Sequence, residues 1–118
     1  NGWIDWNMSV DRTGCPRHVA GGFAAPLFAE DDWRFEKTVS YHYIRQIART
    51  IRPGAVLIGC SVFGKAVEAA AAENRDGSIG VVLFNDSADE ITVSIRLDGS
   101  ICDATLPAHT LNTVIIGR

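Results

Sequence analysis

The second half of the chain is a succession of short strand-like segments separated by turn residues, and this pattern constrains the fold most. Along residues 91–98, Ile, Val, Ile and Leu alternate with Thr, Ser, Arg and Asp, which predicts a strand with one buried and one solvated face. Six such segments at regular spacing predict an antiparallel β-sandwich. The predicted strands are 55–62, 66–73, 78–85, 90–97, 101–106 and 111–116.

The residues between these segments have the chemistry of turns. The stretches 74–77 and 85–89 are rich in Asn, Asp, Ser and Gly, and Asp98-Gly99 predicts a tight hairpin turn. Pro107 ends the strand before it because it cannot donate to a sheet. Residues 69–72 are four alanines, which could form a helix on propensity alone, but the flanking turn signals favour a strand.

The first half has a different organisation. Residues 3–8 alternate as a strand would, with one tryptophan on each face, and residues 9–33 form a long connection without a regular pattern. Apolar residues at helical spacing then predict an amphipathic helix over 36–51, which Pro53 and Gly54 terminate. Connections longer than about 12–15 residues without regular structure are usually functional or disordered, and the long one is interpreted as a substrate-side loop.

A strand, a long loop and one helix do not make a self-sufficient domain. This order is natural for the last strand-loop-helix unit of a (β/α)8 barrel that continues into an all-β domain. We therefore predict a mainly β fold, with residues 1–52 as the end of a barrel and residues 53–118 as a C-terminal antiparallel β-sandwich. Because the chain opens on a strand-like run without Met, it is expected to be a piece of a longer polypeptide.

Composition excludes several classes of function. The net charge is −3, with 11 basic and 14 acidic residues and no basic cluster, which disfavours nucleic acid and anionic membrane surfaces. We expect no membrane span and a soluble protein, cytoplasmic or secreted, since no apolar run is long enough to cross a bilayer. The 3 cysteines are widely spaced and odd in number, so a disulfide framework is not predicted.

Several motifs, in order along the chain, sharpen the barrel interpretation into a family. Gly-Trp-Ile-Asp-Trp-Asn-Met at 2–8, followed by Gly-Cys-Pro-Arg-His-Val at 14–19, resembles the final barrel strand and loop of family 30 glycoside hydrolases, the glucosylceramidase-like enzymes. Further matching stretches are Ala-Pro-Leu-Phe at 25–28, Tyr-His-Tyr at 41–43, Ile-Arg-Pro-Gly-Ala at 51–55, 76–85 and 106–113. The resemblance covers nearly the whole chain.

The resemblance implies a retaining glycosidase acting on a β-glycoside, in carbohydrate or sphingolipid metabolism. Such enzymes use two carboxyl groups about 5–5.5 Å apart, and in this family both are glutamates on earlier barrel strands. No position of this sequence matches them, so we predict no catalytic residue here and no activity for the chain alone. No cofactor or metal is expected.

Three residues are predicted to line the substrate. By resemblance, Trp6 would form an apolar wall against a sugar ring, and Asn7 would orient a neighbour by hydrogen bonding. The alternative for Trp6 is a packing residue at the barrel rim. His18 lies in the loop where relatives place substrate-contacting side chains, or it is a solvated loop histidine. Asp5 is predicted to be structural. Gly21 replaces an asparagine that contacts sugar in glucosylceramidases, which leaves the sugar specificity open.

Alternatives remain for the sandwich and for its partners. It could be a carbohydrate-binding module, but exposed aromatic rows are missing from its sequence, and a purely structural role is favoured. Trp33, Phe35 and Phe63 are predicted to pack at the seam between barrel and sandwich. The sandwich of this family also uses strand material from before the barrel, so a bare sheet edge could pair with a second copy as a homodimer.

Cys15 and His18 form a C-x-x-H without a second ligand pair, so zinc is not predicted.

Overall fold

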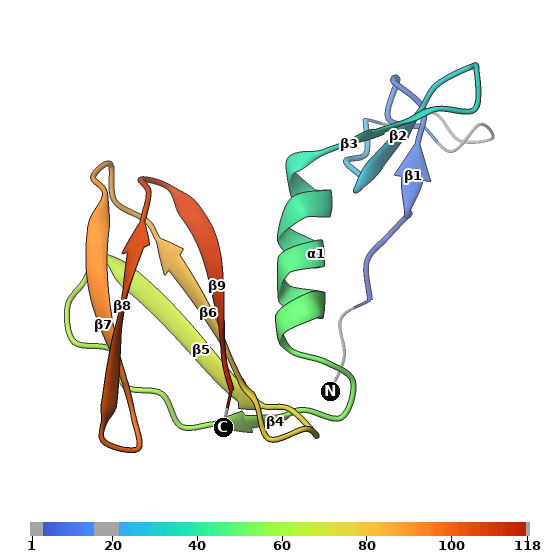
Figure 1. The fold of residues 1–118 in the computed structure, drawn as a ribbon. Helices are drawn as coiled ribbons and strands as arrows, with labels where there is room; N and C mark the ends of the chain where they lie inside the picture. The colour runs from blue at the N-terminus through green and yellow to red at the C-terminus, as the bar shows by residue number, and fades with distance from the viewer. Residues whose placement is uncertain (1–3, 16–21, 118) are drawn as a thin grey trace. The chain divides into compact units, whose positions relative to one another are not determined.

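The structure is a computed structural model that describes residues 4–15 and 22–117 (Figure 1). The chain divides into two compact units, residues 1–45 and 46–118. Each unit has its own β-structure.

The first unit contains a small three-stranded sheet. Strand β1 (Ser9–Val10) pairs in parallel with β2 (Leu27–Ala29), which pairs antiparallel with β3 (Phe35–Lys37). Helix α1 (Val39–Thr50) follows, so the helix predicted over 36–51 is confirmed with a later start. It begins later because residues 35–37 extend to pair with β2.

Two predictions for this part are wrong. Residues 4–8 are not a strand, and the first strand starts at Ser9 instead. Alternation sets which face a side chain takes, but a strand forms only where a neighbour completes its hydrogen bonds. The connection 9–33 is also not free of regular structure, since it contains β1 and β2.

The second unit confirms the predicted antiparallel strands. Four of them, β4 (Val56–Ile58), β5 (Val67–Glu73), β6 (Ile79–Asn85) and β9 (Thr110–Ile116), form one sheet in the order β4-β5-β6-β9. The other two, β7 (Ile91–Leu97) and β8 (Ser100–Leu106), form a hairpin of their own (Figure 1). The four alanines at 69–72 lie in β5 and are therefore extended. The predicted turn Asp98-Gly99 joins β7 to β8, with positive φ at both residues.

The core lies between the larger sheet and the hairpin. Ile79, Val81 and Leu83 alternate along β6 and bury their side chains with Ala71 of β5 and Leu106 of β8. Strand β6 is covered on its other face as well, because an added Cβ at Gly80 would lie 2.4 Å from the carbonyl oxygen of Thr50. Burial on both faces explains the nearly continuous apolar sequence of this strand.

A buried asparagine fastens the end of α1 to the β5–β6 turn. The side-chain amide of Asn74 donates to the Thr50 carbonyl at 3.0 Å and to Ser78 Oγ at 3.1 Å, and its oxygen accepts from the Arg52 N–H at 3.0 Å. Thr50 ends the helix, so its carbonyl has no partner within the helix. Asn74 therefore acts as a side-chain cap of the helix C-terminus.

The same turn carries a perturbed carboxylate. Asp76 accepts hydrogen bonds from Ser78 Oγ at 2.6 Å and from the Ser78 N–H at 3.1 Å, and it pairs with Arg52 at 2.8 Å. The hydrogen bonds from Ser78, with a smaller contribution from Arg52, hold the pKa of Asp76 below its usual value.

Candidate functional site

The predicted substrate-lining residues Trp6 and Asn7 lie in the extended segment just before β1. Trp6 therefore lies before the first strand and belongs to no strand itself. Trp6 is 73% exposed, and its backbone N–H donates to the neighbouring Asp5 carboxylate at 2.8 Å. An exposed indole is available to a ligand. The same exposure is expected if Trp6 packs against residues that do not belong to this sequence.

Asn7 has two unusual features. Its backbone adopts φ 42°, a left-handed conformation that asparagine tolerates better than most residues. Its Nδ2 atom is buried and has no hydrogen-bond partner within the residues that the structure describes. Buried donors are nearly always paired, so this amide is expected to find its acceptor in a group outside those residues.

The third predicted residue, His18, lies outside the described residues, and so does Gly21. Within residues 4–15 and 22–117 there is no group of three or more His, Cys, Asp or Glu side chains that could hold a metal ion. In the same ranges no helix is long and apolar enough to cross a membrane.

A polar hollow of about 530 Å³ lies beside the β2–β3 hairpin of the first unit. Its lining includes Arg12, whose Nη2 donates to Glu30 and to Glu36 Oε2, the latter at 2.8 Å. These two glutamates raise the pKa of Arg12 further above its usual value. The hollow was not found from the sequence, because Arg12 lies 18 and 24 residues before its two partners and no motif links them.

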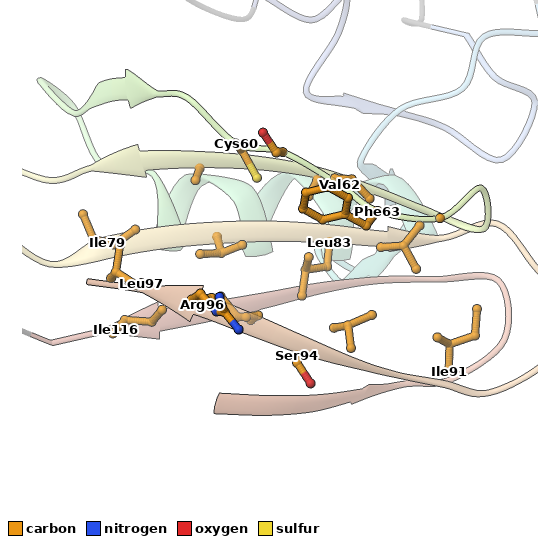
Figure 2. Close-up of a pocket in the computed structure, with 18 of the residues that line it drawn as sticks. Cys60, Val62, Phe63, Ile79, Leu83, Ile91, Ser94, Arg96, Leu97 and Ile116 are labelled. Carbon is orange, nitrogen blue, oxygen red and sulfur yellow. The ribbon is translucent and has the colours of Figure 1, made fainter. Parts of the chain in front are cut away.

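An apolar groove of about 470 Å³ opens in the second unit, and Figure 2 shows the side chains around it. Ile79 and Leu83 of β6, Ile91 of β7 and Phe63 of the connection 59–66 contribute to its lining. Ser94 and Arg96 add polar atoms, but most of the lined surface is apolar. A sugar presents many hydroxyl groups that need hydrogen bonds, so this groove suits an apolar side chain better than a saccharide.

The four-stranded sheet and the hairpin of the second unit define an antiparallel β-sandwich domain, and comparison with known proteins assigns this domain to a family. Residues 54–114 match the family model described as glycosyl hydrolase family 30 beta sandwich domain. The chain belongs to glycoside hydrolase family 30.

Individual relatives agree with this assignment. The chain is 27% identical over 122 aligned residues to a Caenorhabditis elegans protein named "Putative glucosylceramidase 4", covering 97% of the chain and 23% of the relative. Among solved structures, SrfJ from Salmonella typhimurium superposes with a TM-score of 0.88 and 25% identity, covering 98% of this chain and 26% of SrfJ. The endo-beta1,6-glucanase BT3312 superposes with a TM-score of 0.83 and 18% identity, covering 96% of this chain and 26% of the glucanase. The chain thus spans about a quarter of the length of each of these proteins.

Proposed function

We propose that these residues form the C-terminal part of a retaining O-glycosyl hydrolase that cleaves a β-glycoside, in the manner of glucosylceramidases. In this proposal residues 1–52 complete a (β/α)8 barrel and residues 53–118 form a structural sandwich. The observation that carries it is the family match over residues 54–114, joined to a relative named as a glucosylceramidase along 97% of the chain. The quarter-length coverage of that relative supports a catalytic centre built largely by residues outside this sequence.

The carboxylates within the chain also favour a centre elsewhere. Glu30 and Glu36 are brought together by Arg12, and both hydrogen-bond to its guanidinium. A retaining glycosidase needs one carboxyl group that keeps its proton near neutral pH, so that it can act as a general acid. Glu30 and Glu36 are instead engaged as acceptors and ion-pair partners of one guanidinium.

Within this enzyme we assign substrate contacts to Trp6, Asn7 and His18. The exposed indole of Trp6 provides a flat apolar surface, and the unpaired Nδ2 of Asn7 provides a buried donor that a sugar hydroxyl or a neighbouring carboxylate could satisfy. His18 is retained from its position in the loop alone.

Steady-state kinetics of the enzyme that contains these residues, with an aryl β-glucoside as substrate, test this assignment. Trp6→Ala and Asn7→Ala are each expected to lower kcat/KM by roughly ten- to a hundredfold, which corresponds to about 1.4–2.7 kcal/mol of transition-state stabilisation. Phe63→Ala, an exposed aromatic of the second unit, is the control and should leave kcat/KM unchanged. Unaltered kinetics in both site variants would refute the substrate-lining role.

The sandwich is also proposed to associate with a second copy of the chain. Strand β4 is a three-residue edge strand, and the groove beside it exposes apolar side chains. A sheet edge presents unpaired N–H and C=O groups to another strand, and the exposed Val56 and Leu57 of β4 add apolar surface to this edge. Sedimentation velocity of the 118-residue chain should reveal a concentration-dependent dimer, and a strict monomer at high concentration would contradict the association.

A further inference from the structure

The connection between β6 and β7 begins with an acceptor motif for N-linked glycosylation. Asn85-Asp86-Ser87 has the form Asn-x-Ser, in which the side-chain amide nitrogen of the asparagine accepts the glycan and a Ser or Thr is required two residues later. The sequence contains one other motif of this form, Asn7-Met8-Ser9. Such motifs are modified where they lie in surface loops, and the polar stretch 85–89 has the composition of one.

The structure buries this acceptor instead. Asn85 is the last residue of β6 and is 0% exposed. Its Nδ2 atom donates to three carbonyl oxygens, those of Asp89 at 2.8 Å, Pro107 at 2.9 Å and Leu106 at 3.1 Å. One of these carbonyls belongs to the connection after β6, and the other two belong to the end of β8 and the residue after it. A single amide group therefore joins the larger sheet to the hairpin.

The serine of the motif is also held in place. The Ser87 Oγ and N–H both donate to the Asn85 Oδ1, at 2.7 Å and 3.0 Å, and the Ser87 carbonyl accepts from the His109 N–H at 3.0 Å. The backbone of Asn85 lies opposite Val67 in β5 and Thr110 in β9, so a strand pairs with it on each side. The motif cannot detach from the sandwich without breaking these bonds.

A glycan on Nδ2 is incompatible with the contacts of Asn85. In the transfer, Nδ2 forms a bond to C1 of the first sugar and loses one proton to a base of the transferase, while the lipid diphosphate leaves C1 with its bonding electron pair. A primary amide has two N–H donors, so the glycosylated nitrogen would keep one donor for three carbonyls. These oxygens lie 2.8–3.1 Å from Nδ2 and leave no exposed surface for a sugar. A sugar ring fits there only if the hairpin separates from the larger sheet.

We propose that Asn85 is a conditional glycosylation site, which accepts a glycan from a lipid-diphosphate oligosaccharide in the open chain and is protected once the sandwich closes. Folding removes the exposed amide that the modification needs, and the modification removes a donor that the fold uses. The proposal goes beyond the proposed hydrolase and does not depend on it, because it uses contacts of the second unit alone.

A purified eukaryotic oligosaccharyltransferase with a lipid-diphosphate oligosaccharide donor tests the proposal on the 118-residue chain. Peptide mass spectrometry locates the added mass and separates Asn85 from Asn7. The open form is Leu106→Asp, which places a carboxylate at a core position that is 1% exposed, and a synthetic peptide of residues 79–92 is a second open form. Asn85 should react at least about a hundredfold faster in the open forms, because the folded chain reacts only through its small unfolded fraction.

Glu90→Asn is the matched control. It creates the motif Asn-Ile-Thr at an exposed position of the same connection, so the folded variant should be modified at residue 90 and remain unmodified at Asn85. Modification of Asn85 at equal rates in the folded chain and in an open form would overturn the proposal. It would also be overturned if neither open form accepted a glycan at Asn85.

Asn85→Asp tests the structural premise without the transferase. The substitution keeps the shape of the side chain but replaces the donor with an oxygen that lies among three carbonyl oxygens, so the urea midpoint of unfolding should fall. Glu90→Gln, an equally small change at an exposed position, should leave the midpoint unaltered. Equal midpoints in Asn85→Asp and Glu90→Gln would show that the Nδ2 contacts do not hold the sandwich together, and the proposal would fail.

Discussion

Replacement of Asn74 by alanine is expected to be among the most destabilising single changes in the sandwich. The substitution removes the donor to the Thr50 carbonyl and the acceptor of the Arg52 N–H, both at 3.0 Å. Thr50 is 2% exposed, so water cannot readily replace the lost bond. Ser78 Oγ keeps a partner because it still donates to Asp76.

The magnitude follows from the groups left without partners. A buried polar group that loses its hydrogen bond costs about 1–3 kcal/mol, and the more accessible Arg52 N–H should lie at the low end of that range. The sum is about 2–4 kcal/mol, a large part of the roughly 5–15 kcal/mol that stabilises an ordinary domain. The m-value should stay constant, because the area exposed on unfolding hardly changes.

Urea unfolding followed by circular dichroism measures this difference. Asn112→Ala is the control, because the Asn112 amide bonds Thr110, two residues away, and the change should cost less than about 1 kcal/mol. If Asn74→Ala and Asn112→Ala shifted the midpoint equally, the capping role of Asn74 would be refuted.

Three further predictions concern other contacts. Gly80→Ala should cost about 1–3 kcal/mol in urea unfolding, because its Cβ would lie 2.4 Å from the Thr50 oxygen, whereas Gly59→Ala meets no atom within 4 Å and should be neutral. Asp76→Asn should lower stability at neutral pH, since a carboxylate with a lowered pKa stabilises the fold above its unfolded pKa. The difference from the unaltered chain should disappear as pH falls below the usual value of 3.8, and a difference that persisted in acid would contradict the linkage. Arg12→Ala should speed amide hydrogen exchange in β3 and leave exchange in the second unit unchanged. If β3 exchanged at the same rate in the variant and in the unaltered chain, the ion pairs of Arg12 with Glu30 and Glu36 would be dispensable.

The sandwich could be predicted from the sequence because its signals are local. Alternation along 91–97 and turn residues such as Asp98-Gly99 fix strand, register and connection within a few positions. The order of the strands in the sheet could not be predicted from local patterns, because β9 pairs with β6 although the β7–β8 hairpin separates them in the sequence. Asn74 could not be identified as a helix cap either, because its partners lie 22 and 24 residues away.

The first unit was predicted less well, for a physical reason. The segment 4–8 alternates as a strand does, yet among the described residues its backbone is bonded to a neighbouring strand only at its end, where the Leu27 N–H donates to the Met8 carbonyl. The left-handed conformation of Trp33, in the loop between β2 and β3, was also missed. Turn residues with positive φ are usually Gly or Asn, so a tryptophan gives no sign of such a turn. The substrate-lining roles of Trp6, Asn7 and His18 stay predictions that rest on the family.

The central claim is that these residues belong to a retaining hydrolase whose catalytic carboxyl groups lie outside the 118-residue sequence. It is tested most directly by treating the enzyme that contains them with a 2-deoxy-2-fluoro-β-glucosyl inactivator, which traps the covalent glycosyl-enzyme intermediate, and by mapping the labelled residue with peptide mass spectrometry. The account predicts a single labelled glutamate in a peptide outside this sequence. A label on a carboxylate within the sequence, Glu30 or Glu36 above all, or the absence of any covalent adduct during inhibition, would contradict it.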